Sequence, residues 1–174
     1  MITHAGTKDA TLLTELSVTT FCDKFAPLNK PEDMDLYLAA EMNEAKLAAE
    51  LADTENLFLF AQDGNTVVGY AKLRTKERPE GLDAQNPIEL ERLYVRQQHQ
   101  GKRTGSALMD YCLAYATAKQ HDTIWLGVWE RNDGAIKFYE RYGFKIFGAH
   151  PFVLGTDHQT DVMMKRSLDG LQKY

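Results

Sequence analysis

Two glutamates on one predicted strand and a basic, glycine-containing loop that follows it are the residues best suited to chemistry. The segment 88–95 carries Glu89 and Glu91, and the loop 100–106 leads from it toward a helix. An ammonium group has a pKa of about 10 and attacks a carbonyl only after losing a proton, so a nearby carboxylate is a candidate base. The first N–H groups and the dipole of a helix favour a bound phosphate.

The two glutamates share one face of their strand, because strand side chains alternate with a period of two. Either Glu89 or Glu91 could take the proton, directly or through a water, and two acids also suit a cationic substrate. The plainer alternative is a pair of surface charges, and it fits Glu89 better than Glu91. The pattern therefore leaves the choice of base open.

The surrounding pattern predicts an α/β fold. Apolar periodicity and turn residues indicate helices at 8–25, 31–51, 104–119 and 132–142, and strands at 2–5, 56–62, 66–74, 88–95, 123–129, 144–147 and 160–165. The segment 76–87 is polar and contains prolines, which is typical of a loop. A mixed sheet with helices on both faces follows from this order, with a parallel strand–helix–strand unit at its centre.

Composition bounds the remaining possibilities. The chain has 174 residues, 44% hydrophobic and 26% charged, which suits a single domain over residues 1–174. The net charge of −5 disfavours nucleic acid as a partner, and no apolar run is long enough for a membrane span. Cys22 and Cys112 are expected to be buried free thiols, and the scattered histidines predict no metal site. We expect a cytoplasmic protein.

Two motifs resemble the GNAT family of N-acetyltransferases. The first is Gln100-Gly-Lys-Arg-Thr-Gly105, which follows the family pattern of Arg or Gln, two residues, Gly, one residue and Gly or Ala, with arginine at position 103 in place of the first glycine. The second is Asn132-Asp-Gly-Ala-Ile-Lys-Phe-Tyr-Glu-Arg-Tyr-Gly-Phe144, with Asn, Ala, Phe-Tyr and Gly-Phe at the family spacings. A Walker A loop would need glycine at Arg96 and serine or threonine at Arg103.

The resemblance implies the GNAT fold, a mixed, mostly antiparallel sheet whose central parallel strands splay apart, and it implies acetyl-CoA as cosubstrate. The loop would hold the pyrophosphate, and the strand before it would pair with the pantetheine arm. The coenzyme-binding residues so implied are Leu93, Tyr94, Val95, Gln100, Gly101, Lys102, Arg103, Thr104, Gly105, Ser106, Asn132, Lys137 and Phe138. Plain core packing is the alternative for Leu93 and Val95, and helix capping the alternative for Asn132.

Arginine at position 103 raises a question of conformation. A positive φ there would be costly for arginine, whereas at an ordinary helix-entry conformation its N–H still serves a phosphate and its side chain adds a cation. We predict the second conformation.

The resemblance assigns the general acid to Tyr139, which would protonate the departing thiolate of coenzyme A. A glutamate four residues before the valine of the matching strand faces the substrate in polyamine acetyltransferases, which points to Glu91. The predicted activity is acetyl transfer to a primary amine by direct attack in a ternary complex. The PaiA-like branch of the family suggests a polyamine such as spermidine, and the resemblance also implies a homodimer through the last strands. Acetylation of a peptide N-terminus, an amino sugar or an antibiotic, and a non-catalytic acyl-CoA-binding regulator, stay open as alternatives.

Overall fold

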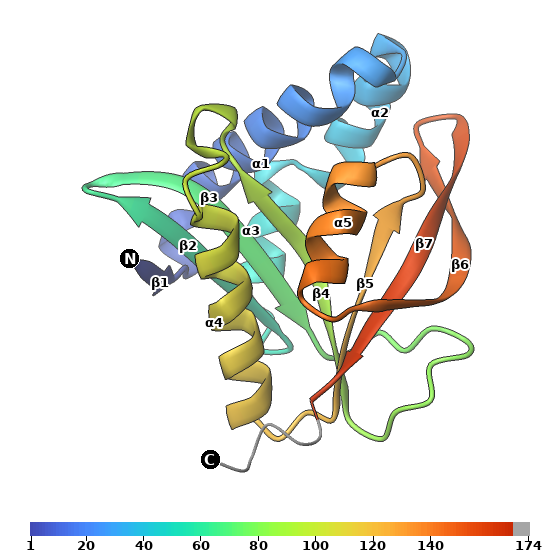
Figure 1. The fold of residues 1–174 in the computed structure, drawn as a ribbon. Coiled ribbons are helices and arrows are strands. Elements are labelled where there is room, and N and C mark those ends of the chain that lie inside the picture. Colours follow the sequence, from blue (N-terminus) through green and yellow to red (C-terminus); the bar gives the residue numbers. More distant parts are fainter. Residues whose placement is uncertain (169–174) are drawn as a thin grey trace.

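The computed structural model describes residues 1–168, and Figure 1 shows their arrangement. The strands are β1 Ile2–His4, β2 Asn56–Asp63, β3 Thr66–Arg74, β4 Pro87–Val95, β5 Thr123–Trp129, β6 Lys145–Leu154 and β7 Asp157–Ser167. The α-helices are α1 Ala10–Phe25, α2 Pro31–Glu41, α3 Glu44–Ala52, α4 Thr104–Ala118 and α5 Asp133–Arg141. No helix among these residues is both long and apolar enough to cross a bilayer.

All of these strands belong to one sheet in the order β1-β2-β3-β4-β5-β7-β6. Neighbours are antiparallel except β4 and β5, which are parallel and are connected through α4. The tight turn between β2 and β3 places Gly64 at φ +58°, a conformation that glycine adopts easily. The predicted mixed, mostly antiparallel sheet with a central parallel pair is confirmed.

Helices cover both faces of the sheet, as Figure 1 shows for α4 and α5 on the near side. Apolar side chains of α4 and α5 pack on β4 and β5 through Leu108, Met109, Cys112, Tyr139, Ile88, Leu90, Ile124 and Leu126. Side chains of α1 and α3 pack on the other face through Leu13, Leu16, Leu47, Phe58, Phe60 and Tyr70. Because strand side chains alternate, Ile88 and Leu90 face α4 while Glu89 points to the opposite face.

Three details of the sequence prediction need correction. The single helix expected over 31–51 is two helices, because Asn43 interrupts it and its Oδ1 caps α3 by accepting from the Lys46 N–H at 2.9 Å. The last two strands are longer than predicted and form a hairpin from Lys145 to Ser167. Cys112 is buried as expected, but Cys22 is only half-buried.

Candidate active site

The central parallel strands separate soon after they begin. Residues 87–89 of β4 pair with residues 123–125 of β5, and within residues 1–168 the two strands form no pair beyond these. The other edge of β4 stays paired with β3 as far as Val95. The far half of β4 therefore presents an unpaired backbone edge toward β5, and a cavity of ≈ 630 Å³ lies at this opening. Such an edge can pair with an extended chain of amides.

A β-bulge lies where the strands separate. Lys72 of β3 pairs with Arg92, whereas its neighbour Leu73 pairs with Leu90, so Glu91 is the extra residue on β4. A bulge bends its strand and re-aims the side chain of the extra residue. It therefore accounts for the divergence of β4 from β5 and for the position of Glu91 at the cavity wall.

The loop before α4 adopts left-handed backbone conformations at two positions. Gly101 has φ +75°, and Arg103, the N-cap of α4, has φ +64° and ψ +10°. The prediction of an ordinary helix-entry conformation at Arg103 is therefore wrong. The loop is held to the end of β4 because the Gln100 side chain donates a hydrogen bond to the Val95 carbonyl at 3.1 Å. At its other end the Thr104 hydroxyl donates to the His99 carbonyl at 3.4 Å, which ties the start of α4 to the same loop.

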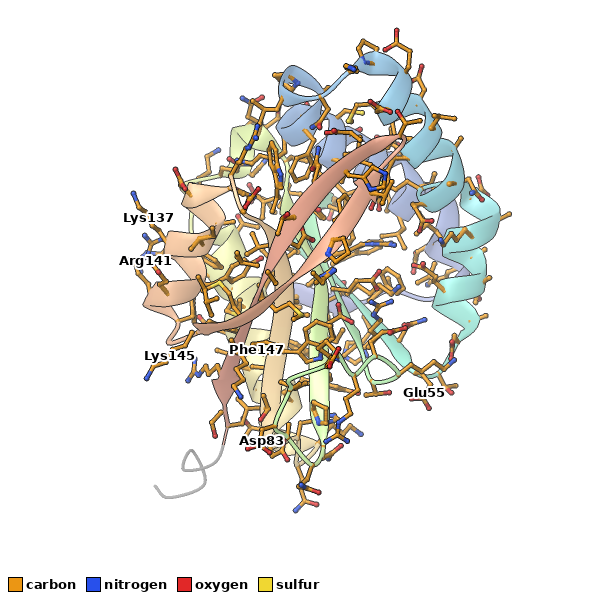
Figure 2. All side chains as sticks on the ribbon, turned by 90° about the vertical axis from the view of Figure 1, so that its right-hand side faces the viewer. Glu55, Asp83, Lys137, Arg141, Lys145 and Phe147 are labelled. Carbon is orange, nitrogen blue, oxygen red and sulfur yellow. The ribbon has the colours of Figure 1, made fainter. Side chains whose placement is uncertain are left out.

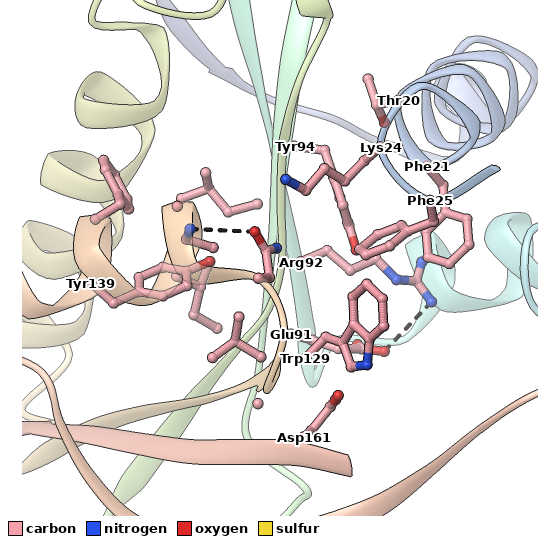
Figure 3. Close-up of a pocket in the computed structure, with 18 of the residues that line it drawn as sticks. Thr20, Phe21, Lys24, Phe25, Glu91, Arg92, Tyr94, Trp129, Tyr139 and Asp161 are labelled. Carbon is pink, nitrogen blue, oxygen red and sulfur yellow. Dashed lines mark hydrogen bonds and ion pairs between the residues drawn. The ribbon is translucent and has the colours of Figure 1, made fainter. Parts of the chain in front are cut away.

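Tyr139 reaches the cavity from α5, as the close-up in Figure 3 shows. Its ring packs against Phe138 and Phe144, with centroids 5.4 and 5.8 Å away. Its hydroxyl has no hydrogen-bond partner among residues 1–168, and burial, followed by the nearby Cys112, raises its pKa well above that of an ordinary phenol. The phenol therefore stays protonated at neutral pH and can donate to a group that enters the cavity.

Asn132 lies at the start of α5 and also lines the cavity. Its side-chain oxygen accepts from the Ala135 N–H at 3.4 Å, so it caps the helix. Capping and contact with a bound molecule are compatible, because the cap uses only one of its polar atoms.

Glu91 is surrounded by cations on the opposite side of the cavity. Its carboxylate lies 2.5 Å from Lys72 Nζ, 3.5 Å from Arg92 Nη2 and 3.6 Å from Arg74 Nε. Burial by itself raises the pKa of Glu91, but Arg92, Lys72 and Arg74 outweigh it, so the pKa is lowered. A carboxylate held ionised in this way is a weak proton acceptor.

The cations around Glu91 belong to a larger buried network. Glu50 of α3 pairs with Lys72 at 2.9 Å and with Arg92 at 3.1 Å, which ties the helix to β3 and β4. Glu89 pairs with Arg74 at 2.5 Å. Burial raises the pKa of Glu89, and Arg74 opposes that shift without cancelling it. Both glutamates expected to face a substrate are thus already paired with protein cations.

Aromatic rings and one further acid complete this side of the cavity. Phe21 and Phe25 of α1, Trp129 of β5 and Phe152 of β6 line it, together with Asp161 of β7. The Phe25 and Trp129 rings meet edge to face, with centroids 6.2 Å apart. Figure 3 shows Phe25, Trp129 and Asp161 on the side of the cavity away from Tyr139.

The tip of the β6–β7 hairpin is attached to α2 above these residues. The Asp33 carboxylate accepts from the Thr156 N–H at 2.6 Å and from the Thr156 hydroxyl at 2.7 Å. These hydrogen bonds lower the pKa of Asp33, the backbone bond being the larger cause. Gly155 passes so close, at φ +62°, that a Cβ there would lie 2.5 Å from the Asp33 Cα. The attachment fixes one wall of the cavity.

The sequence matches a known family over most of its length. The model of the acetyltransferase (GNAT) family aligns with residues 20–144. The chain belongs to this family. An uncharacterized N-acetyltransferase encoded in the pepI 3' region of Lactobacillus delbrueckii subsp. lactis is 35% identical over 167 residues, covering 96% of each chain. An uncharacterized N-acetyltransferase of Mycobacterium tuberculosis is 34% identical over 161 residues, covering 92% of this chain and 98% of its own.

Solved structures of GNAT proteins share the fold. The PaiA N-acetyltransferase from Thermoplasma acidophilum, in complex with coenzyme A, superimposes with a TM-score of 0.77 at 21% identity, over 96% of this chain and 98% of that one. A putative acetyltransferase from Salmonella typhimurium with its cofactor acetyl-CoA gives 0.68 at 22% identity, over 97% and 94%. Together with the family match, these findings make the chain an acetyl-CoA-dependent N-acetyltransferase.

The GNAT fold brings most of the predicted site residues to one cavity. Its lining includes Glu91, Leu93, Tyr94, Val95, Gln100, Gly101, Gly105, Asn132, Phe138 and Tyr139. Thr104 and Ser106 lie half-buried in the first turn of α4, and Lys102 and Arg103 are exposed beside it. Lys137 is exposed on the outer side of α5 and does not line the cavity, as Figure 2 shows.

Sequence reasoning missed the cations that pair with the predicted base, and it missed Asp161 at the cavity. Lys72 and Arg74 occupy an apolar strand without any motif, and only their alternation with buried neighbours could have suggested a shared face. Asp161 ends a polar run, 157–161, that belongs to no motif. The roles of these residues depend on contacts that sequence spacing does not encode.

Proposed function

We propose that this acetyltransferase acts on a primary amine of a small cationic substrate, with polyamines such as spermidine as the leading candidates. The observation that carries the proposal is the shape of the cavity, which joins the unpaired edge of β4 to a chamber lined by aromatic rings and a free carboxylate. Rings and carboxylates together favour an ammonium group. The net charge of −5 and the structural likeness to PaiA support the same class.

The coenzyme side of the proposal rests on backbone groups. The open edge of β4 at Leu93 and Val95 would pair with the pantetheine amides, and the loop from Gln100 to Ser106 would hold the pyrophosphate at the start of α4. Acetyl-CoA supplies the thioester. A backbone N–H near Leu93 would stabilise the negative charge that develops on the thioester oxygen.

Tyr139 would donate a proton to the departing sulfur. A thiol has a pKa of about 8.5, and the buried phenol lies well above this value, so complete transfer to the thiolate is uphill. This raised pKa favours a role in which Tyr139 first donates a strong hydrogen bond to the sulfur. The proton is transferred completely only as the amine loses its own proton. We therefore expect Tyr139→Phe to lower kcat by about 10²-fold, at the lower end of the usual range for acid catalysis.

Thiol release from acetyl-CoA tests the proposal. Wild type and Tyr139→Phe would be assayed with spermidine, putrescine, an amino sugar, an aminoglycoside and a peptide with a free N-terminus. We expect saturable release with the polyamines and much less with the others. Faster release with a peptide or a sugar would assign a different acceptor. Tight coenzyme binding without release for any amine would favour a regulatory role, and full turnover of Tyr139→Phe would remove it as the acid.

We further propose that residues 1–174 work as one domain in the cytoplasm, as a homodimer. All strands within residues 1–168 share one sheet, which supports the single domain. Cys22 and Cys112 are free thiols, which fits a reducing compartment. β6 is an edge strand with Ile146 and Val153 exposed by 55% and 45%, which fits a partner along that edge. Sedimentation of the wild-type chain would test the dimer.

A further inference from the structure

Asp161 is the one acid at the cavity that the described protein leaves unpaired. Of the carboxylates that line the cavity, Glu89 and Glu91 are each held by at least one cation within 4.0 Å, as described above. Asp161 has no hydrogen bond or ion pair to its side chain among residues 1–168. Its pKa is raised by burial, and the influence that opposes this shift comes from His150, its cross-strand partner, which makes no ion pair with it. A half-buried carboxylate without a partner is destabilising, and a cation or hydrogen-bond donor that reaches it removes that cost.

The sheet places Asp161 in a row of residues that share one face. Its antiparallel partners are Trp129 on β5 and His150 on β6, and directly opposed residues point to the same side. Gly127, two residues before Trp129, leaves room in front of the acid. A Cβ at Gly127 would lie 3.5 Å from Asp161 Oδ2 and 3.2 Å from His150 Nε2. The space that remains belongs to the cavity.

The neighbours of Asp161 suit an ammonium group. Trp129 lies beside it, and the Phe25 ring meets Trp129 edge to face, so a cation held by the carboxylate would also contact aromatic rings. Figure 3 shows Lys24, a cation on the same cavity, on the side away from Asp161. Tyr139 faces the cavity from a third side in the same view.

We propose that Asp161, and not Glu91, binds the ammonium of the acceptor and takes its proton; this inference rests on the proposed amine acetyltransferase function. One N–H proton passes to Asp161 and on to solvent. The lone pair left on nitrogen forms the N–C bond as the C–S bond breaks. The sulfur leaves with the electron pair of that bond and takes a proton from Tyr139, which the second N–H proton restores. Glu91 has a structural role instead: it pairs with Lys72 of β3 and Arg92 of β4, which also bind Glu50 of α3.

Three variants with matched changes test this assignment. D161N removes the charge and keeps the shape, E91Q does the same in the buried network, and D83N removes an exposed charge that does not line the cavity. The measurements are kcat/KM with spermidine, the Kd for coenzyme A by calorimetry, and the shift in Tm that spermidine causes in the presence of coenzyme A. The last measurement reports amine binding without turnover.

We expect D161N to lower kcat/KM by about 10²-fold or more. It should also abolish the Tm shift caused by spermidine and leave the Kd for coenzyme A within about twofold, and D83N should match wild type. E91Q should lower Tm but keep the spermidine shift.

A D161N enzyme that keeps either the shift or its kcat/KM would overturn the assignment, as would a wild type whose Tm responds to no cationic amine. An Asp161-dependent shift without thiol release would leave this site standing and refute the proposed acetyl transfer instead.

Discussion

Arg103 adopts a backbone conformation that favours glycine. Replacing it with glycine tests the cost of this conformation and the proposed role of its side chain in coenzyme binding. Its φ of +64° and ψ of +10° are left-handed, at the N-cap of α4. A residue with a Cβ pays about 1–2 kcal/mol for this conformation. Arg103→Gly removes that strain but adds about 0.5–1 kcal/mol of backbone entropy to the unfolded chain. The net expectation is a stabilisation of about 0.5–1 kcal/mol.

For a chain of this length, 1 kcal/mol corresponds to about 2–4 °C, so Tm should rise by about 1–4 °C. Gln120 provides a matched control, since it is exposed, has φ +61°, and lies just beyond the other end of α4. Gln120→Gly should raise Tm by a similar amount. Thermal unfolding followed by circular dichroism measures both. A fall in Tm for Arg103→Gly beside a rise for Gln120→Gly would refute the strain calculation.

The same two variants also test whether the Arg103 side chain contributes to coenzyme binding. If the guanidinium attracts the phosphates, Arg103→Gly should weaken binding several-fold at low salt, and the loss should shrink at high salt because exposed charges are screened. Gln120→Gly should bind coenzyme A like wild type. Titration calorimetry at two salt concentrations measures the affinity. Equal or tighter binding by Arg103→Gly at both would remove any attractive role for its side chain.

Three further predictions concern contacts that support the residues around the cavity. Lys72→Met leaves Glu91 with fewer counter-ions in a buried network and should lower the free energy of unfolding in urea by about 3 kcal/mol. Lys76→Met removes an exposed lysine and should cost far less; equal losses would contradict the network. Gly155→Ala adds a Cβ that would lie 2.5 Å from the Asp33 Cα at a positive φ, and should cost about 2 kcal/mol or more and raise KM for the amine; an unchanged Tm would be inconsistent with this contact. Because the pKa of Asp33 is lowered in the folded protein, its stabilising contribution is complete above the unfolded pKa of about 3.9 and disappears as pH falls through the folded value. Acid should therefore release the hairpin from α2 and lower Tm. Asp33→Asn should make Tm depend less on pH in an acid titration.

Most elements of the fold follow from signals between close neighbours in the sequence. The Asp63-Gly64 turn predicts the β2–β3 hairpin, Pro31 opens α2, and Gly143, at φ +80°, ends α5. The break at Asn43 was missed because the apolar spacing continues through it, and only its cap reveals the new helix. Short-range patterns thus predict which segments are helices and strands better than where they stop.

The sequence by itself determined the order of elements, the glycine-containing loop before α4 and the cavity-lining positions of Tyr139 and Glu91, because motif spacing and strand alternation are local. Only the tertiary structure decided how these residues are used. The left-handed backbone of Arg103 became visible only in the folded loop. Glu91 is neutralised by Lys72 and other cations from separate segments, while Asp161 forms no ion pair within residues 1–168. Which acid is free depends on the charges that folding brings beside it, and no spacing along the chain encodes that.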